Sequence, residues 1–126
     1  MIRYVDTNVL VRIMTNDVPE LAQKAISEVR ASKPKELVIL DAALVELFFV
    51  LEMNKNYRYS RDKIGVIFNG ILNISQFKVS DKSKSAFSLF ISHPELDFMD
   101  CLIAISAKGR NENALTFDGD LKKVLA

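Results

Sequence analysis

The stretch ILDAALVELFFVLEM, residues 39–53, decides the fold class. Between Asp41 and Glu52 every side chain except Glu46 is Ala, Leu, Val or Phe, so a helix formed here is apolar over most of its surface and is expected to be buried. An ionised carboxylate without a partner is strongly unfavourable in such surroundings. Glu46 is therefore expected to have a partner, either a buried Arg or Lys or a bound cation.

Strand-like segments alternate with helical segments on both sides of this stretch. β-Rich runs predict strands at residues 2–5, 36–40, 76–79 and 113–117. Apolar periodicity and capping residues predict helices at residues 7–15, 19–31, 42–54, 60–73, 81–91, 97–110 and 119–125. This alternation predicts an α/β fold in one domain, residues 1–126, with a largely parallel sheet covered by helices on both faces.

The composition is that of an ordinary globular protein and narrows the compartment. The formal net charge of +1 neither demands nor excludes a nucleic-acid partner, so any attraction must come from a local patch. Cys101 is the only cysteine, which excludes an intramolecular disulfide and suits a reducing cytosol. No stretch offers the roughly 18 uninterrupted apolar residues of a membrane span. We expect a soluble cytoplasmic protein with no membrane partner.

Acidic residues stand at the ends of predicted strands and at the starts of helices. Asp6 follows the first predicted strand, and Asp118 follows the last. Glu46 lies one and a half turns into the helix after the second strand, while Asp97 and Asp100 share one helix face at a spacing of three. Because the functional crevice of an open parallel sheet lies beyond the carboxyl ends of its strands, we expect these acids to meet there.

Carboxylates that meet in this way favour a hard divalent cation. They repel one another, and each raises the pKa of its neighbours. Mg²⁺ and Mn²⁺ prefer oxygen ligands, whereas the absence of a His and Cys cluster argues against zinc. Such a site can activate a water for attack on phosphorus and stabilise the leaving oxygen. The predicted chemistry is metal-dependent phosphodiester hydrolysis.

Simpler explanations exist for single acids. Asp6 and Asp41 can be helix caps, and Asp97 can be a residue that favours the positive end of a helix dipole. Asp120 is expected to cap the last helix or to lie exposed. A cap does not explain Glu46, because that residue lies in the middle of its helix.

Four segments together resemble a known family: VDTNVLVRIMTNDVP, VELFFVL, LDFMDCLIAISAK and ALTFDGDL. In order and spacing they are similar to the motifs of PIN-domain ribonucleases, and within these to the VapC-like toxins of prokaryotic type II toxin–antitoxin pairs. The similarity runs from Ile2 to about Lys123. It implies a single PIN domain with a three-layer α/β/α sandwich and a parallel sheet of about four to five strands. It also implies an endoribonuclease that depends on Mg²⁺ or Mn²⁺.

The resemblance assigns roles to particular residues. The catalytic and metal-binding acids of the family fall on Asp6, Glu46, Asp100 and Asp118. Asp97 matches a further metal-binding acid that is frequent in this subgroup. The polar positions that orient the acids or water fall on Thr7, Asn8 and Thr116. The resemblance further implies a homodimer and inhibition by a small antitoxin protein whose C-terminal segment lies over the active-site groove.

Two other hypotheses stay open at this point. The first is a catalytically silent PIN-fold module that binds RNA or protein, against which the retention of all four acids argues. The second is a phosphatase with an aspartyl nucleophile at Asp6, for which a second acid is expected where this chain has Asn8. A basic and aromatic cluster is available to line an RNA groove, or equally to form a solvated loop: Arg12, Lys55, Tyr57, Arg58, Tyr59, Arg61 and Lys63.

Overall fold

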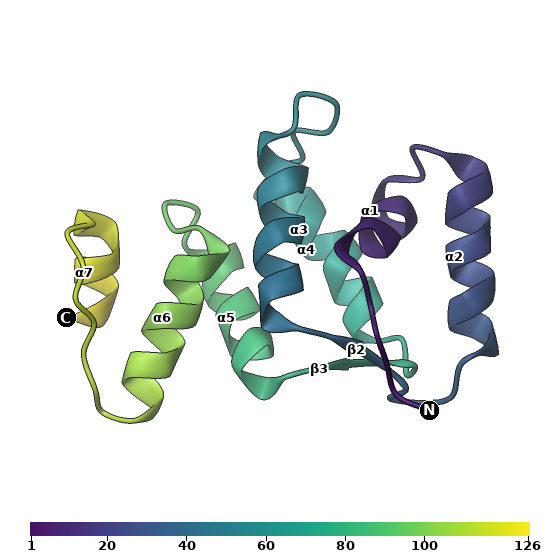
Figure 1. Ribbon diagram of the computed structural model, residues 1–126. Coiled ribbons are helices and arrows are strands. Elements are labelled where there is room, and N and C mark those ends of the chain that lie inside the picture. Colours follow the sequence, from purple (N-terminus) through teal and green to yellow (C-terminus); the bar gives the residue numbers. More distant parts are fainter. The chain divides into compact units, whose positions relative to one another are not determined.

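Three short parallel strands organise the N-terminal part of the chain. The computed structural model describes residues 1–126, which divide into two compact units, Met1–Val79 and Ser80–Ala126, described here one at a time (Figure 1). The elements of the first unit are β1 (Arg3–Tyr4), α1 (Thr7–Thr15), α2 (Pro19–Ala31), β2 (Leu37–Ile39), α3 (Asp41–Met53), α4 (Arg61–Leu72) and β3 (Phe77–Val79). Each element coincides with a predicted one, although the strands are shorter than expected.

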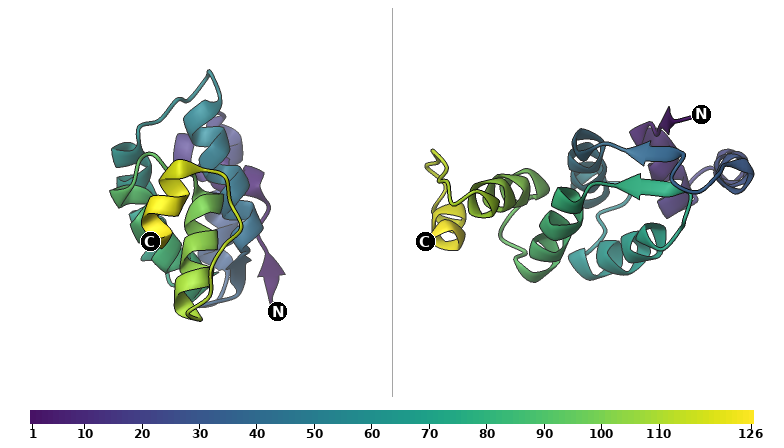
Figure 2. Two further views of the ribbon diagram at one scale, coloured as in Figure 1. Left: turned by 90° about the vertical axis from the view of Figure 1, so that its left-hand side faces the viewer. Right: turned by 90° about the horizontal axis from the view of Figure 1, so that it is seen from below.

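The sheet has the order β1-β2-β3, and both of its pairings are parallel. Figure 2 shows β2 and β3 side by side and running in the same direction. Phe77 and Val79 of β3 are buried, whereas Lys78 between them is exposed. This alternation differs from the continuous burial of a strand covered on both faces. The two parallel pairings confirm the predicted parallel sheet. The three-layer arrangement stays a prediction.

Helix α3 packs by one face only, which corrects the expectation of a helix buried all round. Leu44, Leu47, Phe48 and Leu51 are buried on this face, and α3 packs against α1 and α4. On another face, exposed side chains recur at spacings of three and four residues: Ala42, Glu46, Phe49 and Met53. Apart from Glu46, the apolar sequence of α3 between Asp41 and Glu52 contains no signal that separates these two faces.

Local sequence signals account for most helix starts in this unit. Asp6 caps α1, Pro19 is the first residue of α2, and the hydroxyl of Ser60 accepts a hydrogen bond from the Lys63 N–H at 3.1 Å. The predicted cap at Asp41 is wrong. The N-cap of α3 is Leu40, and Asp41 is the first residue of that helix. Between α3 and α4 the rings of Phe48 and Phe68 meet edge to face, with centroids 5.0 Å apart.

The second unit consists of helices: α5 (Asp81–Ser92), α6 (Phe98–Gly109) and α7 (Gly119–Leu125). The side chains of Ser80, Asp97 and Asp118 cap these three helices in turn. Helix α6 packs against both α5 and α7. Its core contains a second edge-to-face pair, Phe90 and Phe98, with centroids 5.7 Å apart, and the fully buried Cys101.

The fourth predicted strand, residues 113–117, is not a strand in the structure. A strand needs a neighbouring strand for its backbone hydrogen bonds, and this unit otherwise contains helices and turns. The two large apolar side chains of the segment, Leu115 and Phe117, are 95% and 93% exposed. The sheet therefore has three strands instead of the predicted four to five. No helix in the chain has the length and apolar character that a membrane crossing requires.

Candidate active-site carboxylates

Asp6 lies between β1 and α1 and holds the start of that helix. Its Oδ1 accepts a hydrogen bond from the backbone N–H of Asn8 at 3.2 Å. Asp6 is therefore a helix cap, as predicted. Capping uses only one of its two carboxylate oxygens. Asp6 is exposed, and no basic side chain forms an ion pair with it.

Glu46 is exposed on α3, so the expectation that it is buried among apolar side chains is wrong. No Arg or Lys forms an ion pair with it, which removes the salt-bridge alternative. Its partner is instead the buried hydroxyl of Thr7, which lies 3.4 Å from Glu46 Oε2 and 3.5 Å from the Ala43 carbonyl oxygen. Because a hydroxyl has one hydrogen, it can donate to only one of these two oxygens at a time.

Asp97 and Asp100 hold each other at the start of α6. Asp97 Oδ1 accepts a hydrogen bond from the Asp100 N–H at 2.7 Å, and Asp100 Oδ2 accepts one from the Asp97 N–H at 3.3 Å. This reciprocal arrangement is a capping box. It places two carboxylates next to each other at the positive end of the helix dipole.

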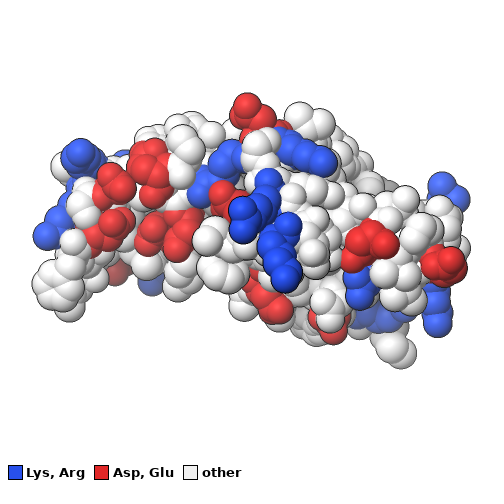
Figure 3. All heavy atoms as spheres, turned by 90° about the horizontal axis from the view of Figure 1, so that it is seen from above, with Lys and Arg blue, Asp and Glu red and all other residues white.

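The carboxyl group of Asp100 is the one whose ionisation this environment opposes. Partial burial, followed by the negative charge of Asp97 and a smaller effect of Asp118, raises its pKa above the ordinary 3.8. Asp and Glu side chains gather over α6 and α7 on the face shown in Figure 3. The raised pKa of Asp100 therefore reflects its partial burial first and the repulsion by neighbouring carboxylates second.

Asp118 caps α7 and is presented by a tight turn. Its Oδ2 accepts a hydrogen bond from the Leu121 N–H at 3.1 Å. Its own N–H donates to the Thr116 hydroxyl oxygen at 3.0 Å, which fixes the backbone just before the helix. Asp118, rather than Asp120, is the cap of this helix.

The five acids share one property. Each uses one carboxylate oxygen to accept a hydrogen bond from a neutral donor, and none is neutralised by Lys or Arg. Asp6 and Glu46 belong to the unit Met1–Val79, and the other three belong to Ser80–Ala126. Neither unit alone assembles three or more His, Cys, Asp or Glu side chains able to hold a metal ion. A site that uses all five acids stays a prediction.

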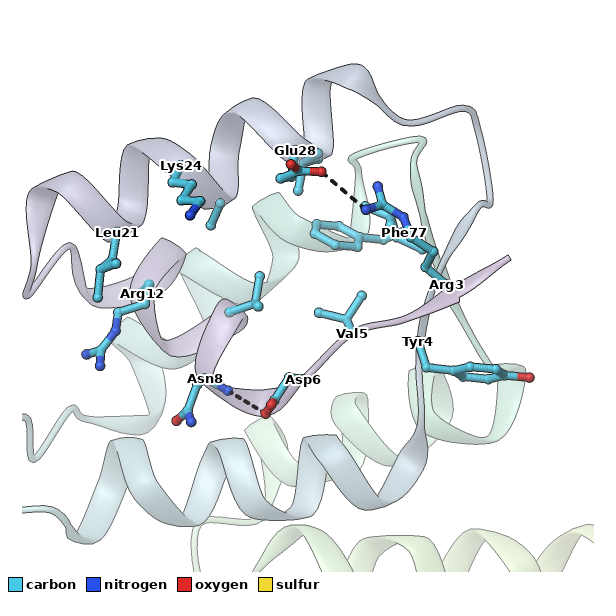
Figure 4. Close-up of a pocket in the computed structure, with 14 residues that line it drawn as sticks. Arg3, Tyr4, Val5, Asp6, Asn8, Arg12, Leu21, Lys24, Glu28 and Phe77 are labelled. Carbon is cyan, nitrogen blue, oxygen red and sulfur yellow. Dashed lines mark hydrogen bonds and ion pairs between the residues drawn. The ribbon is translucent and has the colours of Figure 1, made fainter. Parts of the chain in front are cut away.

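A pocket of about 590 Å³ opens beside Asp6, within the first unit. Figure 4 shows Asp6, Asn8 and Arg12 along one side of it, facing Leu21 and Lys24 of α2. At its other end Arg3 and Glu28 form an ion pair of 3.2 Å. Lys24 and Glu28 are exposed charged residues of an amphipathic helix, a pattern that carries no sign of a pocket beside them. The volume of this pocket lies within the range of about 300–1,000 Å³ found for ligand pockets.

The family model described as PIN domain matches residues 3–125 of the chain. The chain belongs to the PIN domain family. This match spans both units of the structure. No curated protein matches the chain, and no solved structure does. PIN domains are generally nucleases and typically use divalent metal ions, so a nuclease-like function follows for this chain at the level of the family.

Proposed function

We propose that this PIN domain is an endoribonuclease dependent on Mg²⁺ or Mn²⁺ and a VapC-like toxin of a toxin–antitoxin pair. The observation that carries the nuclease proposal is the state of the five acids. All of them lack a basic partner, and each has one carboxylate oxygen that accepts no hydrogen bond from the protein. The resemblance of the four motifs to VapC-like toxins supports the toxin proposal.

The electrostatics of these acids support a bound cation. Buried carboxylates are usually paired, whereas none of these five forms an ion pair with a basic side chain. Burial, followed by the negative charge of Asp97, raises the pKa of Asp100, and a bound cation would offset both effects. The residues that would hold the ion are Asp6, Glu46, Asp97, Asp100 and Asp118. A divalent cation, when bound, supplies charge neutralisation and activates water for attack on a phosphodiester.

The polar residues act as positioning residues in this proposal. Thr7 donates its hydroxyl hydrogen toward Glu46 and so orients that carboxylate, and the Asn8 N–H fixes Asp6. Thr116 accepts the Asp118 N–H and so sets the turn that presents Asp118. In each case the second oxygen of the acid stays available.

The experiment that tests the nuclease is hydrolysis of generic RNA in the presence of Mn²⁺. Wild type is expected to cut the RNA, and a chelator is expected to stop the reaction. Asp6→Asn should lower the rate at least about 10- to 100-fold, which is the loss typical when a residue that only supports a metal ligand is changed. Asn is as good an N-cap as Asp, so the variant should keep α1 intact.

The matched control is Asp81→Asn, which removes the same charge from the start of α5, outside the proposed site. It should cleave like wild type. If wild type leaves RNA intact in Mn²⁺ yet binds it as tightly as Asp6→Asn does, the nuclease proposal is wrong and the silent binding module replaces it.

The toxin, antitoxin and homodimer proposals need tests of their own. Expression of wild type in a host cell should stop growth, and expression of Asp6→Asn should not. A short DNA-binding protein encoded next to this chain should restore growth and bind it. Light scattering of the purified protein should give twice the chain mass of 14.2 kDa. Continued growth with an active nuclease would contradict only the toxin role.

A further inference from the structure

We propose that the loop between α3 and α4, together with the first turn of α4, binds unpaired nucleotides of the RNA. The residues of this basic–aromatic surface are Lys55, Tyr57, Arg58, Tyr59 and Lys63. The inference rests on the proposed function, which it deepens by naming the form of RNA that is recognised and the residues that recognise it.

The backbone of the loop is held in a defined conformation. The N–H groups of Tyr57 and Arg58 both donate to the Asn54 carbonyl oxygen, at 2.9 and 3.0 Å. The Tyr59 N–H donates to the Leu51 carbonyl oxygen at 2.8 Å, which ties the loop to the end of α3. Arg58 adopts a left-handed conformation with φ of 45°. A surface ordered in advance loses less entropy when it binds a ligand.

Two aromatic rings and a cation lie together on this loop. The rings of Tyr57 and Tyr59 are 6.1 Å apart at an angle of 64°, and Lys63 Nζ lies 3.9 Å from the centre of the Tyr59 ring. Bases stack on aromatic side chains regardless of sequence, while Lys and Arg contact the phosphates between them. An aromatic ring beside a free ammonium group therefore matches the alternation of base and phosphate in a single strand.

The surface carries positive charge that the protein does not neutralise. Lys55, Arg58 and Lys63 form no ion pair, and Asp62 is the one nearby acid that is also unpaired. The other neighbouring acids are paired with arginines, Glu52 with Arg61 at 2.9 Å and Asp17 with Arg12 at 2.6 Å. Figure 3 shows Lys and Arg side chains gathered over the loop between α3 and α4. With a net charge of only +1 for the whole chain, this local excess favours an anionic partner.

A hydrogen-bonded brace connects this surface to the helix that begins at Asp6. The Tyr57 hydroxyl donates to Asp17 Oδ2 at 2.7 Å, and Arg12 Nη1 of α1 donates to the same oxygen at 2.6 Å. Helix α1 has nine residues, so its two ends are on the order of 14 Å apart. A few nucleotides of single strand span that distance. Nucleotides held on the loop would thus flank a phosphodiester placed at Asp6.

The test measures RNA binding separately from cleavage. All binding variants are made in the full chain with Asp6→Asn, so that the RNA stays intact. The probe is a fluorescent RNA of about 12 nucleotides, used as a single strand and as a duplex, and its anisotropy is followed at several salt concentrations. Lys55→Ala with Arg58→Ala removes two charges from the surface. The matched control, Arg30→Ala with Lys33→Ala, removes two exposed and unpaired charges elsewhere in the same unit.

For the single strand, the Lys55 and Arg58 double variant should bind more weakly, with a salt slope smaller by about 1.4, since each phosphate contact contributes about 0.7. The control pair should leave the slope unchanged. Tyr59→Ala should weaken binding about 5- to 150-fold, the range that loss of one stacked base gives. Tyr59→Phe, which keeps the ring, should bind like its parent. Duplex binding should not respond to Tyr59→Ala, because paired bases do not offer their faces.

The surface assignment fails if both Tyr59→Ala and the double charge variant bind the single strand as tightly as the control pair. It also fails if Tyr59→Ala weakens duplex and single-strand binding equally. Cleavage is then assayed with Asp6 restored. If wild type binds RNA through this surface without cutting it, the nuclease proposal is wrong and the RNA-binding surface stands. The two proposals therefore fail in different ways.

Discussion

The two units of this PIN domain have similar aromatic packing in their cores, but their acidic side chains have different neighbours. Each core contains an edge-to-face phenylalanine pair, Phe48 with Phe68 in one unit and Phe90 with Phe98 in the other. In Met1–Val79, however, the acids meet neutral donors, as Glu46 meets Thr7. In Ser80–Ala126 the acids also accept backbone N–H groups, but there Asp97 and Asp100 lie next to each other in a capping box.

This difference shows where a counter-charge is needed most. Partial burial and the negative charge of Asp97 together raise the pKa of Asp100, whereas the hydroxyl of Thr7 places no negative charge beside Glu46. The helical unit therefore carries the stronger electrostatic demand for a cation. The strand-containing unit contributes acids that its own hydrogen bonds have already oriented.

The largest expected effect comes from the two aromatic pairs. Phe68→Ala and Phe90→Ala should each lower the free energy of unfolding by about 3–5 kcal/mol, because both rings are fully buried. If the chain is one domain, as the sequence predicts, both variants shift the same single transition in a thermal or urea melt.

The control for this pair is Phe49→Ala, whose ring is 65% exposed. Its effect should stay within about 0.5 kcal/mol. Two separate transitions, with each core variant moving only one of them, would contradict the single domain and show that the units unfold independently.

A divalent cation is expected to have the next largest effect. Mg²⁺ at 100 times its dissociation constant should raise the unfolding free energy by about 2.7 kcal/mol, since it binds only the folded state. Asp100→Asn and Glu46→Gln, one from each unit, should both abolish this increase in a thermal melt. Retention of the full increase by Glu46→Gln alone would confine the ion to the helical unit.

Asp100→Asn should itself stabilise the protein in metal-free buffer. Because the pKa of Asp100 is higher in the folded state, folding becomes less favourable as pH rises from about 3.8 through that higher pKa. The variant escapes this loss and should gain about 1 kcal/mol or less at pH 7, the range of partly exposed charges. The gain should shrink as pH falls toward 3.8. Asp81 lies at the start of another helix. An equal gain in Asp81→Asn would show that the gain does not come from the surroundings of Asp100.

The smallest effect concerns the brace of the first unit. The hydrogen bond from Tyr57 is the largest influence on Asp17, and it lowers the pKa of that carboxyl group. Tyr57→Phe should therefore cost about 0.5 kcal/mol at pH 7, a modest value because the pair is near the surface. The stabilisation is complete above about pH 3.8 and is lost as pH falls through the lowered pKa of Asp17.

The control for the brace is Tyr4→Phe, since the exposed Tyr4 hydroxyl forms no hydrogen bond. Urea melts of both variants at neutral and acidic pH separate loss of the bond from loss of a hydroxyl. Equal effects of the two variants would contradict the prediction.

Features set by neighbouring residues could be predicted from the sequence, and features set by distant contacts could not. Pro19 and Ser60 mark helix starts because their action is local. The exposure of Glu46 could not be predicted, because an apolar helix does not indicate which of its faces will be covered. The β-rich run at residues 113–117 predicts a strand, but a strand also depends on a neighbouring strand that composition alone does not supply.

The same distinction between local and distant contacts holds for the candidate site. The order of the acids along the chain is enough to propose their chemistry, and the capping roles of several of them follow from local signals. The bond from Tyr57 to Asp17 joins residues 40 positions apart, and no pattern in either segment indicates it. Such a contact becomes visible only in three dimensions.

Cys101 offers an internal reporter for the helical unit. It is the chain's only thiol and is 0% exposed within α6, so an alkylating reagent reaches it only when the surrounding helices separate. The alkylation rate under native conditions measures the free energy of that opening. Compared with global unfolding, it tells whether residues 80–126 can open while the parallel sheet stays intact.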